Sequence, residues 1–133
     1  MSRISVSLRT KVGKRAGFRC EYCQIPEFIL ATSFHVDHIQ SIKHGGNDHF
    51  DNLAFACPHC NQNKGTDIAT LSESKQLVRF FNPRIDLWNN HFENHSGLII
   101  GKSDIGNATS KILDFNQTER VILRQLLTEL KII

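Results

Sequence analysis

The sequence has no apolar run that approaches the roughly 20 residues needed to cross a bilayer. The opening segment MSRISVSLRTKVGKR also lacks a hydrophobic stretch behind its basic residues, so it does not have the pattern of a secretory signal. These two absences predict a cytoplasmic protein with no membrane partner. The chain has 133 residues, which is too few for a second large core, and we expect one compact domain.

Acidic residues are absent before Glu21. Six basic residues occupy that segment, namely Arg3, Arg9, Lys11, Lys14, Arg15 and Arg19. A helix over residues 7–16 would place several of them on its solvent side, where they can contact nucleic-acid phosphates, and we name Arg15 and Arg19 as the candidates. A solvated helix face is the alternative interpretation, and charge alone favours it.

Cysteine occurs only four times, in the segments CEYC (Cys20, Cys23) and CPHC (Cys57, Cys60). The spacing within the two pairs is the same, and a CxxC turn aims two sulfurs at one ion. Zn²⁺ accepts four thiolates in a tetrahedron with bonds of about 2.3 Å. The two pairs therefore predict one structural zinc site.

Three other interpretations of the cysteines are weaker. Two disulfides are unusual in a chain without a secretion signal, and a redox CxxC motif normally lies in a βαβ pattern that this sequence lacks. A Cys2His2 finger would use His35 and His38, but it needs three to five residues between its histidines, where this chain has two. It would also leave the second cysteine pair without a role.

The segment between the cysteine pairs has the pattern of a hairpin followed by a helix. FHVDHIQSI alternates as a strand does, KHGGND is a turn in which Gly45 and Gly46 allow positive φ, and NLAFAC is a second strand. After Cys60, the segment NQNKGTDIATL begins a helix with Asn61 near its start. A metal ion would stabilise this unit, which is too small to be stable on its own apolar surface.

In order and spacing, the series CEYC, HVDHI, GG and DNLAFACPHCNQNKG resembles the zinc-containing HNH endonucleases over residues 8–67. The resemblance implies an α+β fold with a ββα-metal core stapled by the four-cysteine zinc site, an N-terminal helix and a helical C-terminal extension. We place the core at residues 1–70 and the extension, packed on the core, at residues 71–133.

The resemblance also implies a role for each motif residue. His38 matches the general base, and Asp37 matches a carboxylate ligand of the catalytic metal. Asn52 matches the central asparagine that holds the base and its loop, and Asn61 matches the second protein ligand, where many members have histidine. Some members add a histidine where this chain has Gly65. An Asp and Asn oxygen pair favours Mg²⁺ or Mn²⁺ over a second zinc.

These residue types suit phosphodiester hydrolysis. A neutral imidazole with a pKa near about 6.5 takes a proton from water at neutral pH, and a divalent ion balances the developing negative charge. Adjacent strand residues point to opposite faces, so we expect an irregular strand at Asp37 and His38. Asn52 as a turn residue and Asn61 as a helix cap remain open alternatives. Lys64 is a candidate phosphate-binding cation, with an ordinary surface lysine as the alternative.

The extension contains no motif that carries chemistry. We expect an extended GLIIG segment, a short helix that starts near Ile105, and a final helix at which Asn116 and Glu119 form a capping box. Four leucines of the final helix share the spacing of one face and predict a core contact: Leu123, Leu126, Leu127 and Leu130.

Together these patterns predict a metal-dependent endonuclease that hydrolyses DNA, and the resemblance implies that it leaves 5′-phosphate and 3′-hydroxyl ends. The alternative is a non-catalytic, zinc-stapled module that binds nucleic acid or protein. Cutting both strands with one site per chain would favour a homodimer, which no feature of the sequence demonstrates.

Overall fold

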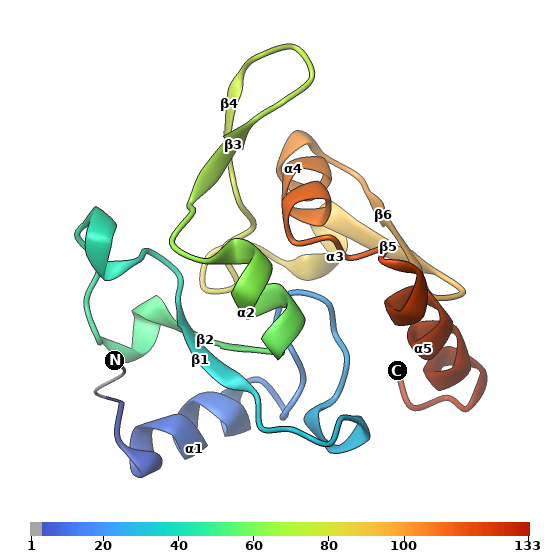
Figure 1. Ribbon diagram of the computed structural model, residues 1–133, viewed down its shortest axis with the longest axis horizontal. Helices are drawn as coiled ribbons and strands as arrows, with labels where there is room; N and C mark the ends of the chain where they lie inside the picture. Colours follow the sequence, from blue (N-terminus) through green and yellow to red (C-terminus); the bar gives the residue numbers. More distant parts are fainter. Residues whose placement is uncertain (1–3) are drawn as a thin grey trace. The chain divides into compact units, whose positions relative to one another are not determined.

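The computed structural model describes residues 4–133, so the predicted basic residue Arg3 lies outside it. The chain divides after Thr66 into two compact units, shown in Figure 1 and described separately below. The division into residues 1–70 and 71–133, with the second part packed on the first, stays a prediction. No helix within residues 4–133 is long and apolar enough to cross a membrane.

The first unit contains one helix followed by the predicted hairpin and helix. Helix α1 (Val6–Arg15) begins at Ser5, whose side chain accepts a hydrogen bond from the Leu8 backbone N–H. Strands β1 (His35–His38) and β2 (Leu53–Ala56) are antiparallel, and helix α2 (Pro58–Lys64) follows directly. Figure 1 shows α2 lying across this hairpin, and α1 contacts β2. The predicted ββα order with an N-terminal helix is confirmed. The predicted start of the second helix after Cys60 is wrong, because α2 begins at Pro58 with Cys57 as its N-cap and ends at Lys64, so Asn61 does not cap it.

The strand at the motif is regular, and the prediction of an irregular strand is wrong. The β1–β2 register runs without interruption from His35 opposite Ala56 to His38 opposite Leu53. His38 is the last residue of β1, so the change in chain direction comes after the motif rather than within it. Two short 3₁₀ turns, η2 (Ile42–His44) and η3 (Phe50–Asn52), then lead the chain into β2.

The two glycines of the loop between β1 and β2 serve different purposes. Gly45 has a φ of 87°, as predicted, and ends η2. Gly46 does not have a positive φ. A Cβ atom on Gly46 would lie 1.8 Å from the Gln40 carbonyl oxygen, so this position requires glycine because two backbone segments approach closely.

The second unit contains two hairpins and three helices. In chain order they are β3 (Ala69–Leu71), β4 (Leu77–Arg79), α3 (Trp88–His91), β5 (Phe92–His95), β6 (Leu98–Gly101), α4 (Asp104–Ile112) and α5 (Thr118–Glu129). The strands pair as β3–β4 and β5–β6, and the structure thus adds two small sheets to the helices that were predicted. The predicted extended GLIIG segment and the helix near Ile105 correspond to β6 and α4. Phe81 and Phe115 pack against the ring of Phe92 in the core.

Helix α5 differs from its prediction at two points. Its N-cap is Gln117 rather than Asn116, because the Asn116 side chain instead donates to and accepts from the backbone of Ile99. The predicted leucine face is wrong, since Leu126 and Leu130 are 51% and 60% exposed. Of the four leucines, only Leu127 is buried.

The buried position in the middle of α5 belongs to a charged residue. Arg124 is 1% exposed, and its guanidinium donates to the carbonyl oxygens of Gly97 and Phe115 and to the Asn116 side chain. Because these carbonyls belong to the β5–β6 turn and to the segment before α5, Arg124 joins the helix to the small sheet. No spacing rule based on apolar residues identifies such a contact.

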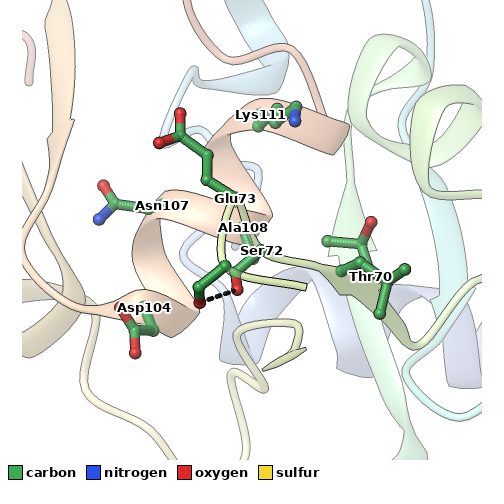
Figure 2. Close-up of a pocket in the computed structure, with 9 residues that line it drawn as sticks. Thr70, Ser72, Glu73, Asp104, Asn107, Ala108 and Lys111 are labelled. Atoms are coloured by element: carbon green, nitrogen blue, oxygen red, sulfur yellow. Dashed lines mark hydrogen bonds between the residues drawn. The ribbon is translucent and has the colours of Figure 1, made fainter. Parts of the chain in front are cut away.

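A depression of about 550 Å³ lies within the second unit, between α4 and the turn of the β3–β4 hairpin. Figure 2 shows Asp104, Asn107 and Lys111 along α4, with Ser72 and Glu73 on the hairpin. Asp104, Glu73 and Lys111 are exposed, so the charged groups of this depression are solvated.

Replacing Arg124 with alanine should lower the free energy of unfolding of the second unit by about 3 kcal/mol, because two buried carbonyls lose their donor and a cavity forms. Urea unfolding followed by the fluorescence of Trp88, the single tryptophan, measures the change. Gln125→Ala, at the exposed neighbouring position, should change it by less than about 0.5 kcal/mol. Equal small effects of both substitutions would contradict the proposed contact.

Candidate functional site

The four cysteines converge on one point inside the first unit. All four are buried, and their sulfur atoms lie within 4.8 Å of one another. The Sγ atoms of Cys23 and Cys57 are 3.7 Å apart, which is close to the edge of about 3.8 Å in a tetrahedron with bonds of about 2.3 Å. A disulfide needs a separation of about 2.05 Å, and none of the four cysteines forms one. The cluster has the donor set and spacing of a structural zinc site, as predicted.

Each CxxC turn is shaped by its own backbone. The Cys20 sulfur accepts from the Cys23 N–H, and the Cys57 sulfur accepts from the Cys60 N–H, both at 3.4 Å. Cys57 is also the N-cap of α2, so the second turn and the helix start at the same residue.

Protonation of the cluster depends on its burial. Burial raises the pKa values of Cys20 and Cys60 well above the usual range, whereas hydrogen bonding from Cys20 lowers the pKa of Cys57. A metal ion must therefore displace protons from buried thiols when it binds, and zinc affinity should increase with pH.

Asp37 lies on the buried side of β1 and is 4% exposed. Its Oδ2 atom accepts a hydrogen bond of 2.8 Å from the Tyr22 hydroxyl, and Lys64 Nζ lies 3.3 Å from Oδ1 and 3.2 Å from Oδ2. Burial raises the pKa of Asp37, while the charge of Lys64 and the hydrogen bond from Tyr22 oppose this rise.

Lys64 is placed differently from the expectation that it contacts a phosphate. It is the last residue of α2, it is 1% exposed, and besides pairing with Asp37 it donates to the His38 carbonyl oxygen at 3.0 Å. The ammonium group of Lys64 therefore makes its contacts inside the unit. It balances the charge of the Asp37 carboxylate and connects α2 to β1.

His38 is half-buried at the end of β1, and its ring contacts a second acid. The Nε2 atom lies 2.7 Å from Oδ1 of Asp48, with 23% of the histidine side chain and 49% of the aspartate side chain exposed. Asp48 lies in the loop after Gly46, ten residues along the chain from His38.

Asn52 fastens the loop that carries Asp48. Its Oδ1 atom accepts from the Gln40 N–H at 2.9 Å, and its Nδ2 donates to the carbonyl oxygens of Gln40 and Asn47 at 2.9 and 2.8 Å. These three bonds hold both ends of the loop together. They are consistent with the loop-holding role expected of Asn52, although its side chain bonds to backbone and not to His38.

Asp37, His38 and Asn61 line the same depression in the first unit, which has a volume of about 380 Å³. Asn61 comes from α2, and its side-chain amide, unlike its backbone N–H, has no hydrogen-bond partner within residues 4–133. Lys43 lines this depression too, and it is exposed. The three predicted residues therefore come together beside a solvated cation.

Three arginines of the N-terminal segment, Arg9, Arg15 and Arg19, make contacts within the first unit. Arg15 donates to the carbonyl oxygens of Phe50 and Leu53, and its guanidinium lies 3.6 Å from the centre of the Phe50 ring. Arg9 similarly donates to the Phe34 carbonyl oxygen. Arg15 thus stabilises the start of β2, while Arg19 pairs with Pro26 in an isolated β-bridge near the first CxxC turn.

The first unit thus combines a ββα arrangement, a four-cysteine cluster that fits a structural zinc site, and an Asp-His pair at the end of its first strand. The family model of the HNH endonucleases matches residues 20–67, which is less than half of the chain and contains all four cysteines and the motif residues. The resemblance predicted from the sequence is confirmed over this segment. No curated protein and no solved structure matches the chain.

Sequence reasoning missed three residues of this site: Tyr22, Lys43 and Asp48. Tyr22 lies between the two cysteines of the first pair, and its position there gave no sign that its hydroxyl reaches Asp37. Lys43 and Asp48 stand in a loop of mixed polar residues, where composition alone does not distinguish a functional side chain from a solvated one.

Removal of zinc should unfold the first unit, because the four cysteines that would hold the ion connect both CxxC turns and the hairpin between them. Metal analysis should find one zinc per chain, and a strong chelator should abolish hydrogen-exchange protection of the β1 and β2 amides. Adding back one equivalent of zinc should restore protection. Full protection of these amides in metal-free protein would contradict the structural role of the cluster.

Proposed function

We propose that this protein is a metal-dependent endonuclease that hydrolyses DNA phosphodiester bonds, with His38 as general base and one divalent cation at Asp37 and Asn61. The observation that carries the proposal is the shared depression, in which an imidazole, a carboxylate and an amide without a described partner meet. The match to the HNH endonuclease family over residues 20–67 supports a nuclease-type function independently.

The oxygen donors of the depression suit a hard cation. Asp37 offers a carboxylate and Asn61 an amide oxygen, and oxygen ligands favour Mg²⁺ or Mn²⁺ over zinc. Lys64 is paired with the Asp37 carboxylate. The carboxylate that would hold the cation therefore already has its negative charge balanced by an ammonium group. Bound there, the ion would supply positive charge to the phosphate and the departing 3′ oxygen.

The chain's own residues account for the other requirements. Neutral His38 removes a proton from water, and the oxygen of that water forms a bond to phosphorus as the bond to the 3′ oxygen breaks. Solvent water protonates the 3′ oxygen, which leaves a 5′-phosphate. Lys43, an exposed residue that lines the depression, attracts the phosphate, and Lys64 with Tyr22 keeps the Asp37 carboxylate in place.

The second candidate is a zinc-stapled module that binds nucleic acid or protein without cutting it. The buried pair of Asp37 and Lys64 favours this alternative, because an ammonium group already balances the carboxylate. A homodimer that cuts both strands and a cytoplasmic location remain predictions from the sequence.

His38→Ala should reduce metal-dependent plasmid nicking by about 10²- to 10⁴-fold, because the general base is lost. Zinc content and the thermal transition should stay those of the parent protein. His44→Ala, at an exposed histidine of the neighbouring turn η2, should leave nicking unchanged. Parent protein that binds DNA with added Mg²⁺ or Mn²⁺ but yields no product would instead support the binding module.

Lys43→Ala should weaken DNA binding more than it slows the chemical step, because an exposed lysine contacts phosphate without touching the reacting water. We expect KM to rise several-fold. The plot of log affinity against log salt has a negative slope, and its magnitude should decrease by about one. Lys43→Arg should restore both. Lys102→Ala, an exposed lysine of the second unit, serves as the control, and equal effects at both positions would contradict a specific role for Lys43.

A further inference from the structure

We propose that Asp48 is the positioning residue of His38: it fixes the imidazole as the Nε2–H tautomer and leaves Nδ1 as the nitrogen that accepts the proton of water. The inference rests on the proposed function of the site and adds to it a residue that the motif does not contain. It also assigns the two ring nitrogens different tasks.

The assignment of the tautomer follows from the chemistry of the contact. Nε2 of His38 is 2.7 Å from Oδ1 of Asp48, and an ionised carboxylate only accepts hydrogen bonds. The proton of a neutral imidazole must therefore reside on Nε2, where it is donated to Asp48. Nδ1 then carries the lone pair, and no described residue bonds to it.

The loop around Asp48 has the rigidity that such a role requires. Asn52 bonds to the backbone of Gln40 and Asn47, and Asn47 directly precedes Asp48. The Asn47 side chain in turn accepts from the His49 N–H at 3.0 Å. Both neighbours of Asp48 are thus fixed, even though its own side chain is half exposed. Asn52 consequently acts on His38 through the loop and Asp48.

The contact between Asp48 and His38 affects the reaction at two stages. Before proton transfer, Asp48 prevents the tautomer in which Nδ1 is protonated and unable to act as a base. After transfer, the imidazolium carries protons on both nitrogens, and the carboxylate stabilises its charge until the Nδ1 proton passes to solvent. Both effects change the rate of the chemical step and leave the contacts with DNA untouched.

Asp48→Asn provides the direct test, because the amide keeps the size of the side chain and is able to donate a hydrogen bond to Nε2, which favours the wrong tautomer. We expect kcat to fall about 10- to 100-fold with KM changed less than about threefold. Asp48→Glu should recover part of the loss. Asp51→Asn, an equal change of charge at an exposed acid three residues away, should leave both constants unchanged.

The second readout is the ¹⁵N NMR spectrum of the His38 ring, recorded without substrate or divalent cation at a pH about two units above the ordinary imidazole pKa of about 6.5. The parent protein should show the Nε2–H tautomer, and Asp48→Asn should shift the population toward Nδ1–H. An unchanged tautomer in Asp48→Asn would overturn the proposal.

The outcomes separate this proposal from the function on which it rests. A rise in kcat in Asp48→Asn would mean that Asp48 blocks the phosphate position, and it would overturn a positioning role. If the parent protein does not cut DNA, the nuclease proposal fails. The positioning role in catalysis then fails with it, while the NMR spectrum still decides whether Asp48 sets the tautomer of His38.

Discussion

The closure of four sulfur atoms around one point is the constraint on which the first unit depends. It joins residues 20 and 60 across a segment whose two strands contain four residues each and whose second helix contains seven. Elements of this length are marginal alone. Because Cys57 both belongs to the four-cysteine cluster and caps α2, the cluster fixes the start of the helix that carries Asn61 and Lys64. The position of the candidate site thus follows from the cluster.

Inside the unit, polar groups are buried in pairs. The Asp37 carboxylate is separated from water, and it is stabilised there by Tyr22 and Lys64, one from the first CxxC turn and one from α2. Burying such a pair contributes little net stability, since the loss of hydration offsets the attraction. What the pair does provide is a carboxylate held in a defined place between strand and helix. The cation site proposed for this depression needs a carboxylate in a defined place more than it needs stability.

The sequence predicted those features that depend on local spacing. Two CxxC pairs, a strand ending in Asp-His and a glycine turn were sufficient to predict the ββα unit and to bring Asp37, His38 and Asn61 together. Long-range partners were not predictable in this way. Lys64 has the pattern of a surface lysine at the end of a helix, and only the fold shows that it faces Asp37. Similarly, apolar periodicity assigned the wrong face to α5, because the buried residue Arg124 satisfies backbone carbonyls.

The central claim is that the depression holds a divalent cation next to a histidine base. Diffraction from crystals soaked in Mn²⁺, with anomalous data collected at the manganese and zinc edges, tests it most directly. The account predicts a zinc peak among the four sulfur atoms and a separate manganese peak bonded to oxygens of Asp37 and Asn61. A saturating soak with no manganese there, and Lys64 still paired with Asp37, would contradict it.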